Sequence, residues 1–289
     1  MIELSERTIS WRGCDDNLLV GSAFGDPLAS PVLLLHGGGQ TRHAWGGTGR
    51  ALAKAGYLAL SLDMRGHGES DWVDDGDYQL DAFVHDLETI LPHFNRPPAV
   101  VGASLGGLTA MLTEGESVTE RLSALILVDV AHRLERSGVE RVVGFMKSRL
   151  DEGFGTLEEA ADAIAAYMPH RRRPTDLSGL AKNLRLGEDG RYRWHWDPRF
   201  VAGPWGPDPD KIPRRLKESA ANLHIPTLLV RGRLSDVLSE DASKEFLELA
   251  PAAEYVDVAA AAHMIAGDKN DVFTDAVVGF LGRMEAVGG

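Results

Sequence analysis

The chain has 289 residues, which is enough for one sizeable α/β domain with an insertion or for two small domains. Its 43 acidic and 30 basic residues leave a net charge of −13, which opposes unspecific binding to nucleic acid or an anionic membrane and favours a small-molecule partner. Cys14 is the single cysteine, so no intramolecular disulfide can form, and residues 1–12 lack the basic and apolar regions of a signal peptide, so we expect a cytoplasmic protein.

Short runs rich in Val, Leu and Ile alternate with helical patterns along most of the chain. The first two runs, at 7–12 and 17–24, are joined by a short turn and predict an antiparallel hairpin at a sheet edge. The other runs predict strands buried on both faces, as in a mostly parallel sheet covered by helices. These runs lie at 32–35, 58–63, 99–101, 122–129, 227–231 and 254–258. Helices are expected at 45–55, 80–91, 105–114, 241–249 and 272–284.

The third predicted strand ends in a glycine-rich stretch, His36-Gly37-Gly38-Gly39. This stretch lies at the carboxyl edge of the sheet, where open α/β sheets bind their ligands. Glycine-rich turns also cradle phosphates, but this one lacks the Gly-Lys-Ser/Thr ending of a phosphate-binding loop. Its backbone amides are therefore candidates for stabilising an oxyanion.

The strand at 99–101 runs into Gly102-Ala103-Ser104-Leu105-Gly106 and then into a helical pattern. This is a G-x-S-x-G motif in the context of strand, turn and helix that a nucleophile elbow requires. In such a turn the serine has strained backbone angles and stands at a helix N-terminus, where N–H groups favour a developing negative charge. Ser104 is therefore the candidate nucleophile.

The alternation of strands and helices stops between residues 131 and 221, where helical patterns predominate. We expect an inserted cap at 131–221, with the α/β core divided between residues 1–130 and 222–289. Half of the six tryptophans lie in this segment: Trp194, Trp196 and Trp205. Such aromatic side chains serve either packing or ligand contact.

Together these features resemble the α/β-hydrolase superfamily over the whole chain except the insertion. The resemblance implies an eight-stranded, mostly parallel sheet with helices on both faces and a cap over the nucleophile. It also implies an oxyanion hole formed by the amides of Gly38 and Leu105. Residues 63–70 (DMRGHGES) are similar to the family's loop after the fourth strand, so we expect a structural role for His67.

The resemblance further implies that an acid and then a histidine follow the nucleophile in chain order. Of the ten histidines, His263 stands between the last strand and the terminal helix, which is the family's position for the base, and its apolar neighbours favour the neutral form. Asp236, after the strand at 227–231, is in the usual position of the acid, whereas Asp129 is in a position that some relatives use. We expect Asp236 to orient His263, with Asp129 as a supporting residue or as the acid itself.

The sequence thus predicts a serine hydrolase that cleaves a carboxylic ester of a small, largely apolar substrate through an acyl-enzyme, with no metal or organic cofactor. A serine at the elbow argues against the epoxide hydrolase and haloalkane dehalogenase branches, which use aspartate there. Lactonases and carbon–carbon bond hydrolases share the same set of residues and are alternatives, as is a noncatalytic ligand-binding protein of the same fold.

Overall fold

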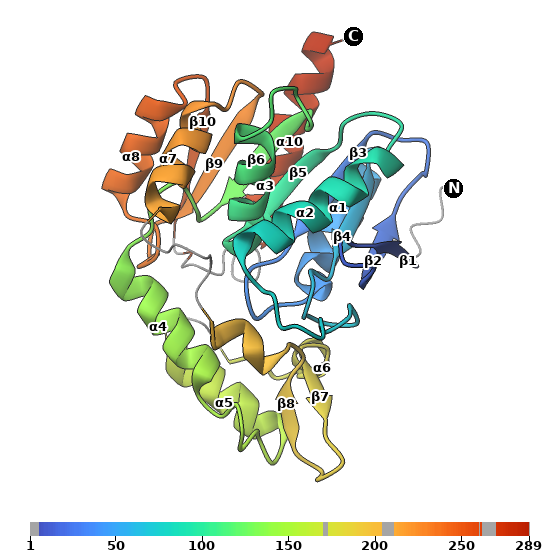
Figure 1. Cartoon of the computed structure of the whole chain (residues 1–289), viewed down its shortest axis with the longest axis vertical. Coiled ribbons are helices and arrows are strands. Elements are labelled where there is room, and N and C mark those ends of the chain that lie inside the picture. Colours follow the sequence, from blue (N-terminus) through green and yellow to red (C-terminus); the bar gives the residue numbers. More distant parts are fainter. Residues whose placement is uncertain (1–5, 170–172, 204–210, 260, 262–269, 289) are drawn as a thin grey trace.

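The computed structural model describes residues 6–169, 173–203, 211–259, 261 and 270–288 (Figure 1). An eight-stranded sheet with the order β1-β2-β4-β3-β5-β6-β9-β10 forms its centre. β2 pairs antiparallel with β1 and β4, and the other pairs are parallel, which confirms the edge hairpin and the mostly parallel sheet. The strands are β1 (Arg7–Arg12), β2 (Leu18–Phe24), β3 (Pro31–Leu35), β4 (Leu58–Leu62), β5 (Ala99–Ala103), β6 (Ala124–Val128), β9 (Thr227–Gly232) and β10 (Glu254–Val258).

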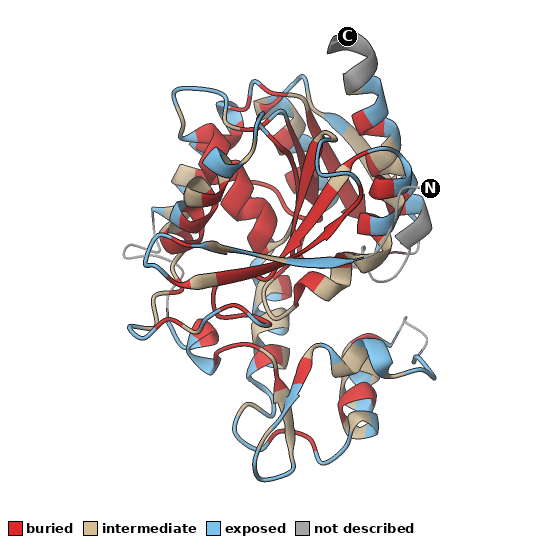
Figure 2. Cartoon of the chain, turned by 90° about the vertical axis from the view of Figure 1, so that its right-hand side faces the viewer, coloured by how far each residue is buried: buried red, intermediate tan, exposed pale blue. Residues whose placement is uncertain are grey.

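Helices cover both faces of the sheet, which is why its strands are apolar on both sides. On β3, Leu33 and Leu35 belong to one hydrophobic cluster and Leu34 to the other, because successive side chains point to opposite faces. The six inner strands are accordingly buried along most of their length, whereas the edge strands β1 and β10 are largely exposed or half-buried (Figure 2). The helices are α1 (Gly46–Lys54) and α10 (Asn270–Gly288) on one face, and α2 (Leu80–Ile90), α3 (Leu105–Gly115), α7 (Ile212–Ala221) and α8 (Glu240–Leu249) on the other.

A second group of elements lies beyond the carboxyl ends of the parallel strands, at the bottom of Figure 1. We call this group the cap. Thr156 caps its second helix through a hydrogen bond from the Glu159 N–H to the threonine hydroxyl (3.1 Å), as a capping box does. The cap consists of α4 (Arg136–Lys147), α5 (Leu157–Tyr167), α6 (Ser178–Ala181), the hairpin of β7 (Leu184–Leu186) and β8 (Tyr192–Trp194), and the 3₁₀ turn η3 (Pro198–Val201).

Helix α7, expected as the end of the insertion, lies on the core instead of in the cap. Just beyond it, the Asn222 side chain donates a hydrogen bond to the Gly115 carbonyl at the end of α3 (2.9 Å), and Arg215 forms ion pairs with Glu116 and Asp81. Residues 131–221 therefore divide between the cap and the helical layer of the core. Among the described residues, no helix combines the length and apolar character that crossing a membrane requires.

Candidate active site

Ser104 stands in the sharp turn between β5 and α3, with a φ of 46° and a ψ of −113°. A positive φ is unfavourable for a residue with a side chain, so the surrounding structure must hold it. Glycines make the turn possible: a Cβ at Gly102 would lie 2.5 Å from the Gly106 carbonyl oxygen, and one at Gly106 would lie 2.6 Å from the Leu35 carbonyl oxygen. The Ser104 N–H donates to the Val128 carbonyl at the end of β6 (3.3 Å). The local geometry is that of a nucleophile elbow.

Two buried histidines hold the glycine-rich loop that faces Ser104. His67 Nε2 accepts a hydrogen bond from the Gly39 N–H (3.1 Å), so its Nδ1 carries the proton and donates to the Arg65 carbonyl (2.9 Å). His36 is fixed in the same tautomer, because its Nε2 accepts from the Met64 N–H (3.0 Å). Burial lowers the pKa of His67 to about 3 and that of His36 to about 4, so both are neutral. His67 thus has the structural role that we expected, which is to accept the hydrogen bond from the Gly39 N–H.

Gly38 and Leu105 both line the cavity beside Ser104. Neither N–H donates to an acceptor within the described part of the chain, and that of Leu105 is the first of helix α3. The ring of Phe200 in η3 covers Gly38, since a Cβ there would lie 3.0 Å from its Cζ, and the same ring contacts His67 edge-on with centroids 4.8 Å apart. The sequence offered no signal for this contact beyond an aromatic residue in the insertion.

The two candidate acids lie in very different surroundings. Asp129 directly follows β6, is fully buried and has a φ of 52°. Its carboxylate accepts hydrogen bonds from the Gly232 N–H (2.9 Å) and from the hydroxyl of Ser235. The carboxylate of Asp236 is 36% exposed and forms an ion pair with Arg141 of α4 (3.2 Å). Asp129 is therefore held rigidly in the core, whereas Asp236 is engaged with the cap.

His263 and Trp205 lie outside the described residues. In chain order His263 does stand between β10 and α10, where the sequence analysis placed it. Ala261, the last described residue before it, is buried, and its carbonyl accepts a hydrogen bond from the Leu234 N–H (2.9 Å). Ala261 therefore lies beside the loop that carries both Ser235 and Asp236.

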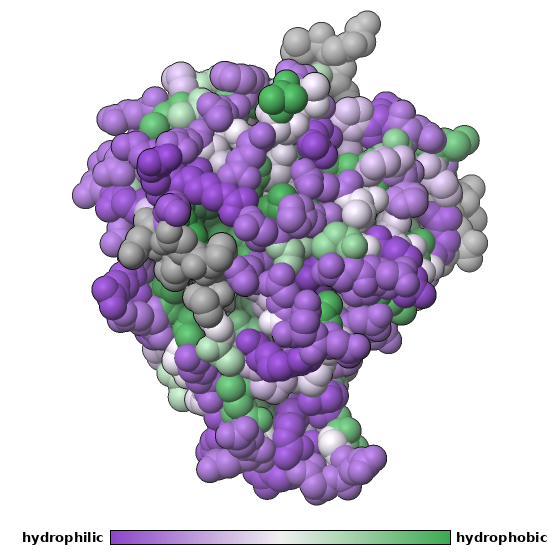
Figure 3. Space-filling view, in the orientation of Figure 1, coloured by the Kyte–Doolittle hydropathy of each residue, from purple (hydrophilic) through white to green (hydrophobic). Residues whose placement is uncertain are grey.

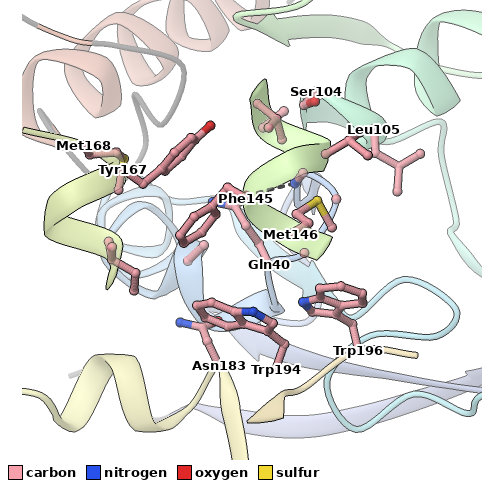
Figure 4. A pocket seen from close by; sticks show the side chains of 18 of the residues that line it. Gln40, Ser104, Leu105, Phe145, Met146, Tyr167, Met168, Asn183, Trp194 and Trp196 are labelled. Atoms are coloured by element: carbon pink, nitrogen blue, oxygen red, sulfur yellow. Dashed lines mark hydrogen bonds between the residues drawn. The ribbon is translucent and has the colours of Figure 1, made fainter. Parts of the chain in front are cut away.

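A cavity of about 610 Å³ opens at Ser104 between the sheet edge and the cap. Its walls are mostly apolar and come largely from the cap, in contrast to the mainly hydrophilic outer surface (Figure 3). Phe145 stacks on Tyr167 with centroids 4.2 Å apart and meets the edge of Trp194 at 5.8 Å. Figure 4 shows these rings with Trp196 and Met146 around the space in front of Ser104. The cavity thus brings together a serine in a strained turn, two backbone amides and mostly apolar walls, as small-molecule sites have.

Sheet, elbow and cap together define an α/β hydrolase. A sequence model of the α/β hydrolase fold matches residues 30–269, so the chain belongs to this family. An esterase of Mycobacterium tuberculosis is 30% identical over 225 residues, which are 75% of this chain and 70% of the esterase. A mouse (Mus musculus) sn-1-specific diacylglycerol lipase is 26% identical over 272 residues, covering 89% and 82% of the two chains. The crystal structure of an α/β hydrolase from Novosphingobium aromaticivorans superposes with a TM-score of 0.78 at 26% identity, covering 96% of this chain and 97% of that one.

Proposed function

We propose that this α/β hydrolase is a serine esterase. Ser104 Oγ attacks the ester carbonyl while His263 takes its proton, the oxyanion is held by the N–H groups of Gly38 and Leu105, and the alcohol leaves with that proton. Water, activated by His263, then releases the acid. The observation that carries the proposal is the strained backbone of Ser104 on the wall of a cavity that also receives both amides. The relatives named esterase and lipase support ester cleavage.

We favour Asp129 over Asp236 as the acid that orients His263. A triad acid is buried and accepts hydrogen bonds. Asp129 is fully buried, and its carboxylate accepts a hydrogen bond from the Gly232 N–H. The carboxylate of Asp236 is 36% exposed and forms an ion pair with Arg141. β6, which Asp129 directly follows, pairs with β5, the strand that leads into Ser104. A carboxylate has about four acceptor sites, so Asp129 can accept from an imidazole N–H alongside the Gly232 N–H and the Ser235 hydroxyl. This choice reverses the preference drawn from chain position alone.

The cavity favours a small, largely apolar acyl group. Its volume of about 610 Å³ lies within the range of small-molecule sites, and aromatic and aliphatic side chains form most of its wall. Burying an acyl methylene against such a wall contributes about 0.8 kcal/mol. Affinity should therefore rise with acyl length until the cavity is filled.

Turnover and covalent labelling test the proposal together. The purified protein should hydrolyse p-nitrophenyl acetate and butyrate, and a fluorophosphonate should label Ser104 in a stoichiometric reaction found by peptide mass spectrometry. Ser104→Ala and His263→Ala should each lower kcat by roughly 10⁴- to 10⁶-fold without loss of folding, because triad members act as a unit. If either variant retained more than a tenth of the activity, the mechanism would be refuted, and tight ligand binding without turnover or labelling would indicate a receptor.

A further inference from the structure

Residues 232–239, which join β9 to α8, hold the carboxylate of Asp129, and we call this segment the acid loop. The Gly232 N–H donates to one carboxylate oxygen (2.9 Å), and the Ser235 hydroxyl donates to the other. Ser235 Oγ in turn accepts the N–H groups of Val237 and Leu238 (3.1 and 3.2 Å). A hydroxyl has one proton and two lone pairs, so all its hydrogen-bonding positions are used and its proton is directed to Asp129.

The acid loop is also bonded to the part of the chain that precedes His263. The Arg233 N–H donates to the Val258 carbonyl at the end of β10 (3.1 Å), and the Leu234 N–H donates to the Ala261 carbonyl (2.9 Å). The two residues directly before Ser235 thus contact the last described residues before the proposed base. One short segment therefore connects the proposed acid with the chain leading to that base.

The first helix of the cap, α4, supports the acid loop from outside the core. The Glu135 N–H, just before α4, donates to the Val237 carbonyl (2.8 Å), and the Ser239 hydroxyl donates to the Glu135 carboxylate. A Cβ at Gly138 in α4 would lie 2.1 Å from the Asp236 carbonyl oxygen, so helix and loop are in direct contact. Because the backbone of the loop is held by these contacts, it should stay in place when a single hydroxyl is removed.

We propose that Ser235 is a positioning residue, whose hydroxyl holds the Asp129 carboxylate in the orientation that accepts the N–H of His263. This inference rests on the proposed esterase function with Asp129 as the acid. Asp129 is fully buried, so the loss of a donor leaves a charged oxygen without a partner and is costly. Ser235 does not line the cavity beside Ser104, so its effect on the reaction passes through Asp129.

A double-mutant cycle tests this role. Ser235→Ala should lower kcat for p-nitrophenyl butyrate roughly five- to thirtyfold and change KM less than twofold, because the lost hydrogen bond is made to a charged group that does not touch the substrate. In an Asp129→Asn background the same substitution should lower kcat less than about twofold, because no carboxylate is left to position.

Two further substitutions at the same position separate the hydroxyl from packing. Ser235→Thr keeps the hydroxyl and should retain kcat within about threefold of the parental value. Ser235→Cys has a similar size but only a weak donor, so its kcat should fall between those of the threonine and alanine variants. The cysteine variant provides the same cycle if Ser235→Ala does not fold, which urea unfolding determines.

Ser239→Ala is the matched control. The Ser239 hydroxyl belongs to the same loop, accepts the Ala242 N–H (3.1 Å) and donates to a different carboxylate, that of Glu135. This variant should lose stability but keep kcat within about twofold.

The inference would be overturned if Ser235→Ala kept the parental kcat, if it lowered kcat equally in both backgrounds, or if Ser239→Ala caused the same fall. Each of these results leaves the esterase proposal intact as long as the parental protein turns over esters and is labelled at Ser104. Absence of both turnover and fluorophosphonate labelling would instead overturn the esterase proposal itself.

Discussion

At the scale of single residues, backbone strain marks the site. Among the described residues only four that are not glycine have a positive φ, and two of them, Ser104 and Asp129, directly follow the neighbouring strands β5 and β6. Such conformations cost about 1–3 kcal/mol each and persist where the surrounding structure determines them. The hydrogen bond from the Ser104 N–H to the Val128 carbonyl ties the two turns together. Ser104 and Asp129 are therefore held in a fixed relation to one another by the backbone.

The first prediction ranks the two acids. Asp129→Asn should lower kcat by about 10²- to 10⁴-fold, because an amide in place of the carboxylate favours the wrong histidine tautomer. Asp236→Asn, which loses only a half-exposed ion pair with Arg141, should lower kcat less than tenfold. Steady-state kinetics with p-nitrophenyl butyrate measures both variants, and circular dichroism verifies that they fold. The opposite ranking would assign the triad acid to Asp236.

At the scale of elements, hydrogen bonds hold the cap to the core directly beside the glycine-rich loop at residues 36–39. We call this segment the oxyanion loop after its proposed role. The Gly68 N–H donates to the His195 carbonyl (2.7 Å), and the Asp197 N–H donates to the Gly66 carbonyl (2.8 Å). The Tyr78 hydroxyl adds a hydrogen bond to the Asp197 carboxylate (2.6 Å). These bonds position η3 so that its aromatic ring rests on the loop. A change in η3 should therefore reach the chemistry.

The second prediction concerns that ring. Phe200→Leu should lower kcat at least tenfold with a smaller change in KM, because Gly38 and His67 lose the ring that presses the oxyanion loop into place. The rate of Ser104 labelling by a fluorophosphonate should fall as well. Phe154→Leu is the matched control, since Phe154 is equally buried in the cap but does not line the cavity. Equal kcat values for the two variants would mean that Phe200 contributes only to packing.

The third prediction concerns the tryptophans of the cap. Trp194→Ala and Trp196→Ala should each change kcat/KM unequally across p-nitrophenyl esters of increasing acyl length, since a lost apolar contact is worth about 1–3 kcal/mol of discrimination. Trp11→Ala, at the sheet edge and away from the cavity, should preserve the profile. If both cap variants kept the parental profile, the two rings would serve packing and the acyl site would lie elsewhere.

At the scale of the whole molecule, the residues of the proposed chemistry and those of the proposed selectivity lie in two different parts. The sheet and its loops carry Ser104, Gly38, Leu105 and both candidate acids, while the cap supplies most of the cavity wall. Stability is linked to the same loops, because His36 and His67 are fully buried as neutral rings beneath the oxyanion loop. Acid should therefore weaken the fold and the site together.

The fourth prediction gives the sign of that effect. The pKa values of His36 and His67, about 4 and about 3 when folded, lie below the usual 6.5, so the unfolded chain binds more protons at intermediate pH. Their contribution is complete above pH 6.5 and is lost as the pH falls to about 4 for His36 and to about 3 for His67, with a slope of about 1.4 kcal/mol per pH unit for each histidine within that range. Urea unfolding between pH 7 and pH 5 measures the slope.

His67→Gln provides the comparison, because the glutamine carbonyl can still accept the Gly39 N–H but does not titrate. In this variant the free energy of unfolding should change less steeply with pH, by the contribution of one histidine, about 1.4 kcal/mol per pH unit. Identical slopes in the two proteins would show that His67 is not responsible for the pH dependence.

The sequence by itself determined the sheet and the sharp turn at Ser104. Strands buried on both faces are recognisable as continuous apolar runs, and the elbow at Ser104 is a local motif whose glycines are required by backbone contacts within a few residues or with the neighbouring strand. Gly38 and Leu105 were assigned through the resemblance to the α/β-hydrolase family, and the structure places both on the wall of the cavity beside Ser104. The strands and the turn depend on residues close together in the chain, which is why a single sequence reveals them.

Only the tertiary structure decided what depends on contacts between distant segments. Chain position favoured Asp236 over Asp129, whereas the burial of Asp129 and the ion pair of Asp236 with Arg141 favour Asp129. The placement of α7 on the core and of Phe200 on Gly38 joins residues about 100 or more positions apart. No local pattern encodes such pairings, because side-chain burial and charge pairing depend on which surfaces the fold brings together.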